Sequence, residues 1–565
     1  MTGIPPFPAP WPWEKSYPAG LSPRVELPVW PLGSIVDRAA GSFAGKDAII
    51  FRGIRWTYAE LKARVDEAAA AFLRAGLGKG ARIALFLPNT LYHPLAFFGA
   101  MKAGATVVHL SPLDSPRVIQ HKLADSGARV VVTTNIGEMA SGAAKLVAAG
   151  LIDRLIVGDD AAFGASPLTG PLTGPIPSGE GIGTFEQFVA GAGAEAGYPS
   201  VDVEDLALLQ YTGGTTGMPK GAKLTHRNLS AAVSSYDIWF TGQGLSQNGE
   251  DRILLFLPLF HIYALTTILL KGLNNGNTLL MHTRFDAETA LLEIESGATS
   301  FPGVPTMWIA VAAVPGFEKR DFSSMRYCAS GGAPLPVELG RKLKKTTGHD
   351  ILGGWGMTET SPAGTNIPKG RGDKIGTIGV PLPGIYMDIV ALDDPTRVLP
   401  QGETGELRIF GDNVTKDYLN REAEHDRFFS DGGFLTGDIG FIDAEGFFTI
   451  VDRKKDMIIS GGFNVYPQLI EQMIYEHPDV HEVLVIGVPD DYRGEAAKAF
   501  VTLRKGAVEL TLEALKEFLK ERVGKHEMPA HLEIRESLPR TSVGKLSKLE
   551  LKQEEAERRQ AAKAS

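Results

Sequence analysis

Short apolar runs alternate with helical patterns over the first 135 residues. The runs at 48–51, 82–88, 106–110 and 130–134 predict strands, and their mostly apolar character is typical of strands buried on both faces. Between them, apolar residues recur at the three- and four-residue spacing of helices. This alternation predicts a largely parallel sheet covered by helices on both faces, and therefore an α/β fold class.

The ends of the predicted helices carry local signals. Thr57 is followed three residues later by Glu60, which is a capping-box pattern at a helix start. Ser115 and Pro116 are typical of another helix start, and Gly104 is expected to end the helix between them.

The pattern changes near residue 450. From residue 452 to the end, 39 of 114 residues are charged, against 84 of the first 451. Helical patterns around 469–474 and 512–523 enclose two strand-like runs at 482–488 and 496–504. The sequence therefore predicts a large, multi-subdomain N-terminal α/β body and a small C-terminal α+β domain. We place their limits at 31–453 and 454–565, after an N-terminal arm at 1–30.

Two segments resemble targeting or membrane elements without fitting either. The proline- and tryptophan-rich arm lacks a basic start before an apolar core, so we expect a flexible or surface-packed segment and not a signal peptide. The uncharged run at 253–270 contains Pro258 and His261, which favours a buried strand, a loop and a buried helix over a membrane span. We therefore expect a soluble protein.

Composition excludes several classes of protein. The apolar content of 44% excludes a disordered chain, and a single cysteine excludes a disulfide scaffold and favours a reducing compartment, so we expect a cytoplasmic location. A net charge of −9 argues against a surface that binds nucleic acid.

The densest chemical signal is the segment from Tyr211 to Gly221, which directly follows an apolar run. Its glycines leave backbone N–H groups free to approach an anion, its threonines add hydroxyl donors, and its lysine adds a positive charge. The alternative is a glycine-rich surface turn, and the spacing is not that of a Walker A motif. The predicted phosphate-binding residues are Thr212, Gly213, Gly214, Thr215, Thr216, Gly217 and Lys220.

This segment resembles the phosphate-binding signature of the acyl-adenylate-forming (AMP-binding) superfamily. Six further segments resemble that superfamily's motifs in the expected order; they are 258–261, 331–334, 354–359, 436–438, 452–456 and 539–545. The segment at 452–467 is most similar to that of bacterial medium- and long-chain fatty acyl-CoA synthetases, with a dicarboxylate–CoA ligase as a variant.

The resemblance implies a site for ATP. Glu359 would help to hold Mg²⁺, although a glutamate read alone is more often a surface acid, and Asp438 would bind the ribose hydroxyls with help from Arg453. Trp355 stands where a tyrosine is commoner, and it either faces adenine or belongs to the core. The remaining residues implied along the nucleotide are Gly332, Ala333, Pro334, Gly354, Gly356, Met357 and Thr358.

The resemblance also implies how the acid and the thiol are handled. Lys545 would be the catalytic lysine of adenylation, Lys455 the hinge, and His261 the gate of the carboxylate site, although a histidine among apolar residues is usually structural. No enzyme nucleophile is required, so Cys328 is expected to be a small buried hydrophobe. The predicted lining of the coenzyme A tunnel is Ser460, Gly461, Gly462 and Phe463.

The predicted function is an AMP-forming acyl-CoA synthetase that uses ATP, Mg²⁺ and coenzyme A on a fatty or dicarboxylic acid. A luciferase-like oxygenase, an aryl-CoA ligase and a non-catalytic nucleotide-binding homologue are the alternatives. The resemblance further points to acetylation of Lys545 by a protein acetyltransferase, reversed by a deacetylase, and leaves peripheral membrane association and a homodimer open.

Overall fold

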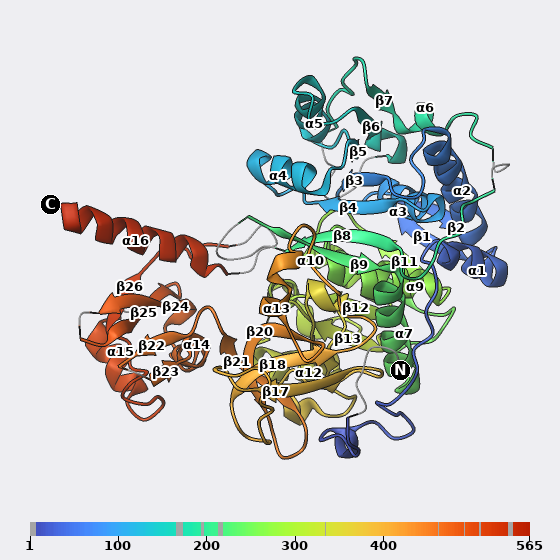
Figure 1. The fold of residues 1–565 in the computed structure, drawn as a ribbon. Helices are drawn as coiled ribbons and strands as arrows, with labels where there is room; N and C mark the ends of the chain where they lie inside the picture. Colours follow the sequence, from blue (N-terminus) through green and yellow to red (C-terminus); the bar gives the residue numbers. More distant parts are fainter. Residues whose placement is uncertain are drawn as a thin grey trace.

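The computed structural model describes residues 7–164, 173–193, 197–212, 218–333, 335–461, 463–490, 492–507, 510–540 and 546–564. Four sheets organise these residues (Figure 1). Three belong to the N-terminal body, and the fourth belongs to the C-terminal domain, which lies beside the body in Figure 1.

The first sheet has seven strands in the order β7-β6-β5-β3-β4-β8-β9, and only the last pair, β8 with β9, is antiparallel. It contains three of the predicted strands. Its strands are β3 (Arg82–Phe86), β4 (Thr106–Leu110), β5 (Val130–Thr134), β6 (Arg154–Gly158), β7 (Ile182–Thr184), β8 (Leu206–Thr212) and β9 (Lys220–Thr225).

The second sheet has nine strands and takes in the first apolar run, which the alternation predicted in the same sheet as β3. β1 (Asp47–Phe51) pairs in parallel with β11 (Thr278–Met281) and in a hairpin with β2 (Ile54–Thr57). A local pattern could not show which sheet β1 joins, because the pairing of β1 with β11 is made between segments more than 200 residues apart. The other strands are β10 (Arg252–Leu255), β12 (Ser300–Gly303), β13 (Tyr327–Ser330), β14 (Ile351–Trp355), β15 (Thr365–Asn366) and β16 (Val380–Pro381).

Helices fill the space between and around these two sheets. Every residue of α3 (Tyr92–Ala103) is buried, and Ile49, Leu85 and Ile253, which come from both sheets, share one core with it. The other helices of the body are α1 (Ser34–Phe43), α2 (Tyr58–Arg74), α4 (Pro116–Ser126), α5 (Met139–Ala148), α6 (Phe185–Val189), α7 (His226–Gly242), α8 (Ile262–Ala264), α9 (Lys271–Asn274), α10 (Ala287–Glu295), α11 (Pro305–Ala312), α12 (Val337–Thr347) and α13 (His425–Phe428).

The helix limits predicted at Thr57, Gly104 and Ser115 are confirmed. Thr57 and Glu60 form both hydrogen bonds of the capping box at the start of α2. Ser115 caps α4 through the N–H of Val118, and Gly104 ends α3 in the left-handed conformation. The run at 253–270 is a strand, a loop and a buried helix, and the helix includes a π-helical segment from Leu265 to Leu270. No helix among the described residues could cross a membrane.

The third sheet is antiparallel and completes the body. Its strands are β17 (Tyr386–Val390), β18 (Gly405–Phe410), β19 (Phe429–Ser430), β20 (Gly433–Ile442) and β21 (Phe448–Arg453). Inside it, Arg408 forms a buried ion pair with Asp388 at 2.8 Å.

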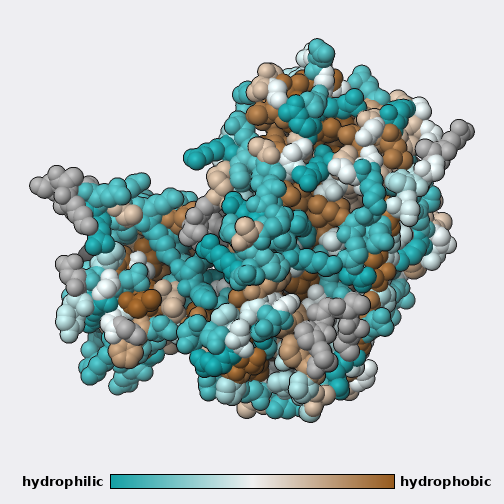
Figure 2. Space-filling view, viewed as in Figure 1, coloured by the Kyte–Doolittle hydropathy of each residue, from teal (hydrophilic) through white to brown (hydrophobic). Residues whose placement is uncertain are grey.

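In the C-terminal domain, helices cover both faces of the fourth sheet, because alternate residues of its two long strands pack in two separate cores. The sheet consists of β22 (Ile458–Ser460), β23 (Phe463–Val465), β24 (Val480–Asp490), β25 (Gly494–Leu503) and β26 (His531–Ile534), and the helices are α14 (Pro467–Tyr475), α15 (Leu512–Leu519) and α16 (Lys548–Ala564). The expected helix around 512–523 is shorter than its apolar spacing suggested, because α15 ends at Leu519. On the face shown in Figure 2, hydrophobic areas lie separated among hydrophilic ones.

The N-terminal arm is more deeply packed than we expected. Trp13 is fully buried, and its ring lies 5.7 Å from Phe448, 5.5 Å from Tyr386 and 5.4 Å from Trp11, measured between centroids. The arm thus completes the core of the third sheet.

We predict that Trp13→Ala destabilises the body strongly. Removing a fully buried aromatic ring leaves a cavity and typically lowers the free energy of unfolding by about 3–5 kcal/mol. Chemical denaturation followed by fluorescence measures this change. Tyr492→Ala is the control, because the Tyr492 side chain is 95% exposed, and an equal loss in both variants would contradict the structural role of the arm.

Candidate functional site

The strand pair β8–β9 presents the predicted phosphate-binding segment. Thr212 at the end of β8 lies opposite Lys220 at the start of β9. The predicted residues between them, Gly213, Gly214, Thr215, Thr216 and Gly217, lie outside the described residues. The hairpin geometry nevertheless brings both ends of the segment to one edge of the first sheet.

Lys220 lies in an aromatic and acidic surrounding. Its Nζ is 4.3 Å from the ring centroid of Phe428, 5.6 Å from that of Tyr418 and 3.7 Å from Oε2 of Glu424. The Lys220 side chain is about one-third exposed, so its ammonium group is available to an anion and yet restricted in direction.

Glu359 is buried beside the same tyrosine. It lies in a single 3₁₀ turn (Thr358–Thr360), and its Oε1 accepts a hydrogen bond of 2.5 Å from the hydroxyl of Tyr418. Burial raises the pKa of the Glu359 carboxyl, while the Tyr418 hydroxyl and the charge of Arg453 act in the opposite direction. Tyr418 therefore joins Glu359 to the surroundings of Lys220.

Three predicted nucleotide-site residues contact one another directly. Arg453 Nε lies 2.6 Å from Asp438 Oδ1, and the indole N–H of Trp355 donates to Asp438 Oδ2 at 2.8 Å. Asp438 and Arg453 are also opposite residues in the pairing of β20 with β21. Burial raises the pKa of Asp438, and Arg453 partly offsets this effect.

The backbone around these residues is shaped by glycine. A Cβ atom added to Gly356 would lie 1.4 Å from the carbonyl oxygen of Pro362, so no other residue fits there. Gly332 has a φ of 76°, in the left-handed region that favours glycine. Among the other predicted residues, Gly354 and Trp355 end β14, Met357 precedes the turn at Thr358, Ala333 follows Gly332, and Pro334 lies outside the described residues.

His261 lies at the end of the loop that follows β10. Its Nδ1 accepts a hydrogen bond from the backbone N–H of Tyr263 and so caps α8. The side chain of Tyr263 packs near Gly331, where an added Cβ atom would lie 2.9 Å from its ring. The loop with His261 therefore adjoins the turn at 331–333.

The link between the body and the C-terminal domain contains the predicted hinge. Lys455 lies just after β21, and burial lowers its pKa. The carboxylate of Asp452 accepts hydrogen bonds from the backbone N–H groups of Arg453 at 2.6 Å and of Gln468 at 2.7 Å. Asp452 thus connects β21 to the start of α14.

The predicted tunnel residues lie on the hairpin of β22 and β23. Ser460 pairs with Phe463, and the N–H of Gly461 donates to the carbonyl of Arg493 at 2.7 Å. The Phe463 side chain is 59% exposed and lies 5.1 Å from the ring of His526. These contacts are made within the C-terminal domain, and Gly462 and Lys545 lie outside the described residues.

Tyr418 contacts both Glu359 and Lys220, although the sequence did not predict it as a site residue. It follows no recognised motif, and its importance comes from the loop at 411–420 folding against the 3₁₀ turn. Asn413 holds that loop by donating to the carbonyls of Thr360 and Ala363, both at 2.8 Å, and Thr415 N–H donates to the carbonyl of Glu359 at 2.7 Å. Only these long-range contacts reveal it.

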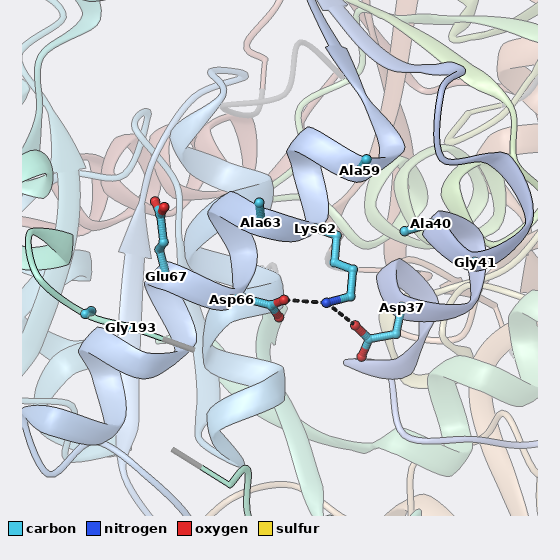
Figure 3. Close-up of a pocket in the computed structure, with 10 residues that line it drawn as sticks. Asp37, Ala40, Gly41, Ala59, Lys62, Ala63, Asp66, Glu67 and Gly193 are labelled. Carbon is cyan, nitrogen blue, oxygen red and sulfur yellow. Dashed lines mark hydrogen bonds and ion pairs between the residues drawn. The ribbon is translucent and has the colours of Figure 1, made fainter. Parts of the chain in front are cut away.

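A separate pocket of about 640 Å³ lies between α1, α2 and the loop at 192–193 (Figure 3). Lys62 points between Asp37 and Asp66 in Figure 3 and forms ion pairs with both. Because these charges satisfy one another, and because α1 and α2 lie apart from β20 and β21 in Figure 1, the pocket is not part of this site.

The side chains at the site fit a nucleoside triphosphate and one divalent cation. Mg²⁺ is usually bound by one or two carboxylates together with substrate phosphates. Glu359 offers such a carboxylate, and among the described residues no group of three or more His, Cys, Asp or Glu side chains could hold a metal ion by themselves. Cys328 is buried, and burial raises the pKa of its thiol to about 12, as expected for a small buried hydrophobe.

Comparison with known proteins identifies two matching family models. The model of the AMP-binding enzyme matches residues 36–419, and that of the AMP-binding enzyme C-terminal domain matches residues 469–545.

Individual relatives extend over nearly the whole chain. A long-chain-fatty-acid–CoA ligase of Bacillus subtilis is 35% identical over 97% of this chain and 98% of its own length. A feruloyl-CoA synthase of an Amycolatopsis species is 34% identical over 92% of this chain and 98% of its own length. The solved structure of ATP-bound MatB from Rhodopseudomonas palustris is 28% identical, with a TM-score of 0.81 over 92% of this chain and 98% of that one. The chain therefore belongs to the AMP-binding enzyme family and is an AMP-forming acid–thiol ligase.

Proposed function

We propose that the enzyme activates a long-chain fatty acid as its acyl-adenylate and then transfers the acyl group to coenzyme A. One observation carries the proposal: Tyr418 joins the buried carboxylate of Glu359 to the surroundings of Lys220. A cation and a metal-binding carboxylate at one place are what a reaction between two anions, a carboxylate and a phosphate, requires.

In the first half-reaction, a carboxylate oxygen of the substrate forms a bond to the α-phosphorus of ATP, and the bond to pyrophosphate breaks. Lys220 and Lys545 contribute positive charge to the phosphates, with the glycine-rich segment at 213–217 as their backbone cradle. Asp438 accepts hydrogen bonds from the ribose hydroxyls, and Arg453 and Trp355 hold its carboxylate in place. Mg²⁺, held by Glu359 and phosphate oxygens, would neutralise part of the phosphate charge when bound.

In the second half-reaction, the thiol of coenzyme A loses its proton and its sulfur forms a bond to the acyl carbon, while the bond from that carbon to the phosphate oxygen breaks and AMP leaves. We propose that the C-terminal domain turns at Lys455 between the two steps, so that Ser460, Gly461, Gly462 and Phe463 line the approach of the thiol. The exposure of Phe463 supports this proposal, because a large apolar side chain is available for a new contact. His261 is proposed to gate the carboxylate site.

The acid is proposed to be a long-chain fatty acid because relatives with that printed activity cover nearly the whole chain. A medium-chain or dicarboxylic acid is the nearest variant. An aromatic acid is the second candidate, favoured by the similarity to a feruloyl-CoA synthase.

Substrate profiling tests the proposal. Release of pyrophosphate and AMP is measured with ATP, coenzyme A and a panel of monocarboxylates of graded length, dicarboxylates and ferulate. We expect the highest kcat/KM with long-chain monocarboxylates. Turnover of ferulate alone would favour the aryl-CoA ligase, oxygen uptake with a luciferin would indicate an oxygenase, and a complete lack of AMP would indicate a non-catalytic homologue.

We predict that Lys545→Ala impairs adenylation far more than thioester formation. Loss of a charge that stabilises the transition state typically costs about 10²–10³ in rate. ATP–pyrophosphate exchange measures the first step, and conversion of supplied acyl-adenylate with coenzyme A measures the second. Lys505→Ala, an exposed lysine of the same domain, is the control, and equal damage to both steps would contradict the assigned role.

We also predict that Tyr418→Phe moves the acidic limb of the pH–activity profile to higher pH. The Tyr418 hydroxyl favours ionised Glu359 and so lowers its pKa against the effect of burial. Without that hydroxyl the pKa rises further, so Glu359 becomes protonated, and Mg²⁺ binding weakens, at a higher pH as the solution is acidified.

The matched control is Tyr92→Phe. Tyr92 is also buried, and its hydroxyl also donates to a glutamate, Glu186, but in another part of the body. The pH dependence of kcat/KM for Mg·ATP is measured for both variants. An acidic limb that shifts equally in both, or in neither, would remove Glu359 from the proposed metal site.

Regulation and location are proposed on the sequence resemblance. Acetylation of Lys545 would remove its charge and stop adenylation. Treatment with a deacetylase would restore adenylation. A cytoplasmic enzyme with peripheral membrane association, and a homodimer, remain proposals that cell fractionation and sedimentation can test.

A further inference from the structure

The loop that follows β10 is held from outside by two buried amide side chains. Asn89 comes from the segment after β3, in the first sheet. Its Nδ2 donates to the carbonyls of Leu257 at 3.0 Å and His282 at 3.2 Å, and its Oδ1 accepts from the N–H of Leu259 at 2.8 Å. Asn89 therefore binds the loop on both sides of Pro258.

Gln210 in β8 holds the next residue of the same loop. Its Nε2 donates to the carbonyl of Phe260 at 2.9 Å, and its Oε1 lies 2.8 Å from Nδ1 of His109 in β4. His109 Nε2 lies in turn 3.2 Å from Nε2 of His93 in α3. A line of four polar groups thus runs from α3 to the residue directly before His261.

The chemistry of these groups gives the line one direction. The Phe260 carbonyl can only accept, so Gln210 must present its amide nitrogen to it and its oxygen to His109. His109 must then carry its proton on Nδ1, and its Nε2 accepts the proton of His93 Nε2. The nitrogen left over, His93 Nδ1, is then an acceptor, and it is one of the buried polar atoms that have no hydrogen-bond partner within the described residues.

Burial keeps both imidazoles neutral, as this direction requires. His93 and His109 are at most 1% exposed. Burial lowers the pKa of His109 to about 4 and that of His93 well below its ordinary value. The line is therefore uncharged near neutral pH and adds no charge beside the predicted phosphate-binding segment that follows β8.

We propose that Asn89 and Gln210, with Gln210 oriented by His109 and His93, are positioning residues that set the His261 loop for the acid substrate. The proposal rests on the proposed function, in which His261 lies at the carboxylate site. The four side chains come from the first sheet, the segment after β3 and helix α3, whereas the loop follows a strand of the second sheet, so these contacts fix the loop relative to the first sheet. None of the four is proposed to touch the reacting atoms.

Asn135 provides a matched control within the same sheet. Like Asn89, it is buried and follows a parallel strand, in this case β5. It also makes three hydrogen bonds, by donating to Asp159 Oδ1 at 2.8 Å and the Gly174 carbonyl at 3.1 Å and accepting from Asp160 N–H at 2.9 Å. It holds a different loop, so it reports the general cost of losing a buried amide.

The experiment compares Asn89→Leu, Gln210→Leu and Asn135→Leu in the full-length enzyme, with KM for the acid, KM for ATP and melting temperature as readouts. Misplacing a group that positions the substrate can lower the reaction rate by up to about 10²-fold. In Asn89→Leu and Gln210→Leu we expect KM for the acid to rise about tenfold or more, while KM for ATP stays nearly unchanged. All three variants are expected to lower the melting temperature by similar amounts, because each loses one buried amide. Asn135→Leu is expected to leave KM for the acid unchanged.

Two variants of His109 test the positioning role if the leucine variants at 89 and 210 do not fold. His109→Gln keeps a donor for Gln210, whereas His109→Leu removes it. A KM for the acid that stays near the wild-type value in the first and rises in the second supports the positioning role, and equal KM values overturn it.

The outcomes also separate this inference from the proposed function. If the wild-type enzyme forms acyl-adenylate and the variants at 89 and 210 match Asn135→Leu in KM for the acid, only the positioning role is wrong. If the wild-type enzyme adenylates none of the acids, the proposed function is wrong, and the positioning role is wrong with it.

Discussion

Charged groups are buried in this protein where each has a specific partner, and the site depends on that constraint. An ionised side chain is costly to remove from water unless an opposite charge or a hydrogen-bond donor compensates it. Asp438 has Arg453 and Trp355, and Glu359 has Tyr418. These partners come from different strands and loops, so satisfying the charges also assembles the site.

The same constraint separates the rigid part of the site from the part proposed to move. In the body, strand pairing holds Asp438 opposite Arg453. Beyond β21, polar contacts join the C-terminal domain to the body, with Asp452 bound to the N–H of Gln468 and Lys454 paired with Glu406 at 2.7 Å. Hydrogen bonds and ion pairs of this kind can be exchanged for water at modest cost, whereas a packed core cannot.

Neutral amides take the corresponding role where the two large sheets meet. Asn89 and Gln210 reach backbone groups of a loop, and a backbone carbonyl needs a donor and not a charge. A lysine at either position could also donate to the carbonyls, but it would bury a positive charge and offer no acceptor to the N–H of Leu259 or to Nδ1 of His109. Amides therefore fix the loop without disturbing the electrostatics of the site.

Much of the fold follows from local features of the chain. Thr57 with Glu60 starts a helix, Gly104 ends one, and the apolar runs at 82–88, 106–110 and 130–134 become adjacent strands, because caps and apolar spacing act within a few residues. The ordered motifs likewise identified the family, because the glycines, threonines and lysine of the predicted phosphate-binding segment lie together at 211–221. Other features depended on contacts between distant segments: the pairing of β1 with β11, the burial of Trp13, the contact of Tyr418 with Glu359, and the line from His93 to Phe260. Their partners lie tens to hundreds of residues away, and no local pattern in the chain specifies which buried polar group will meet which, so only the packing of the sheets determines them.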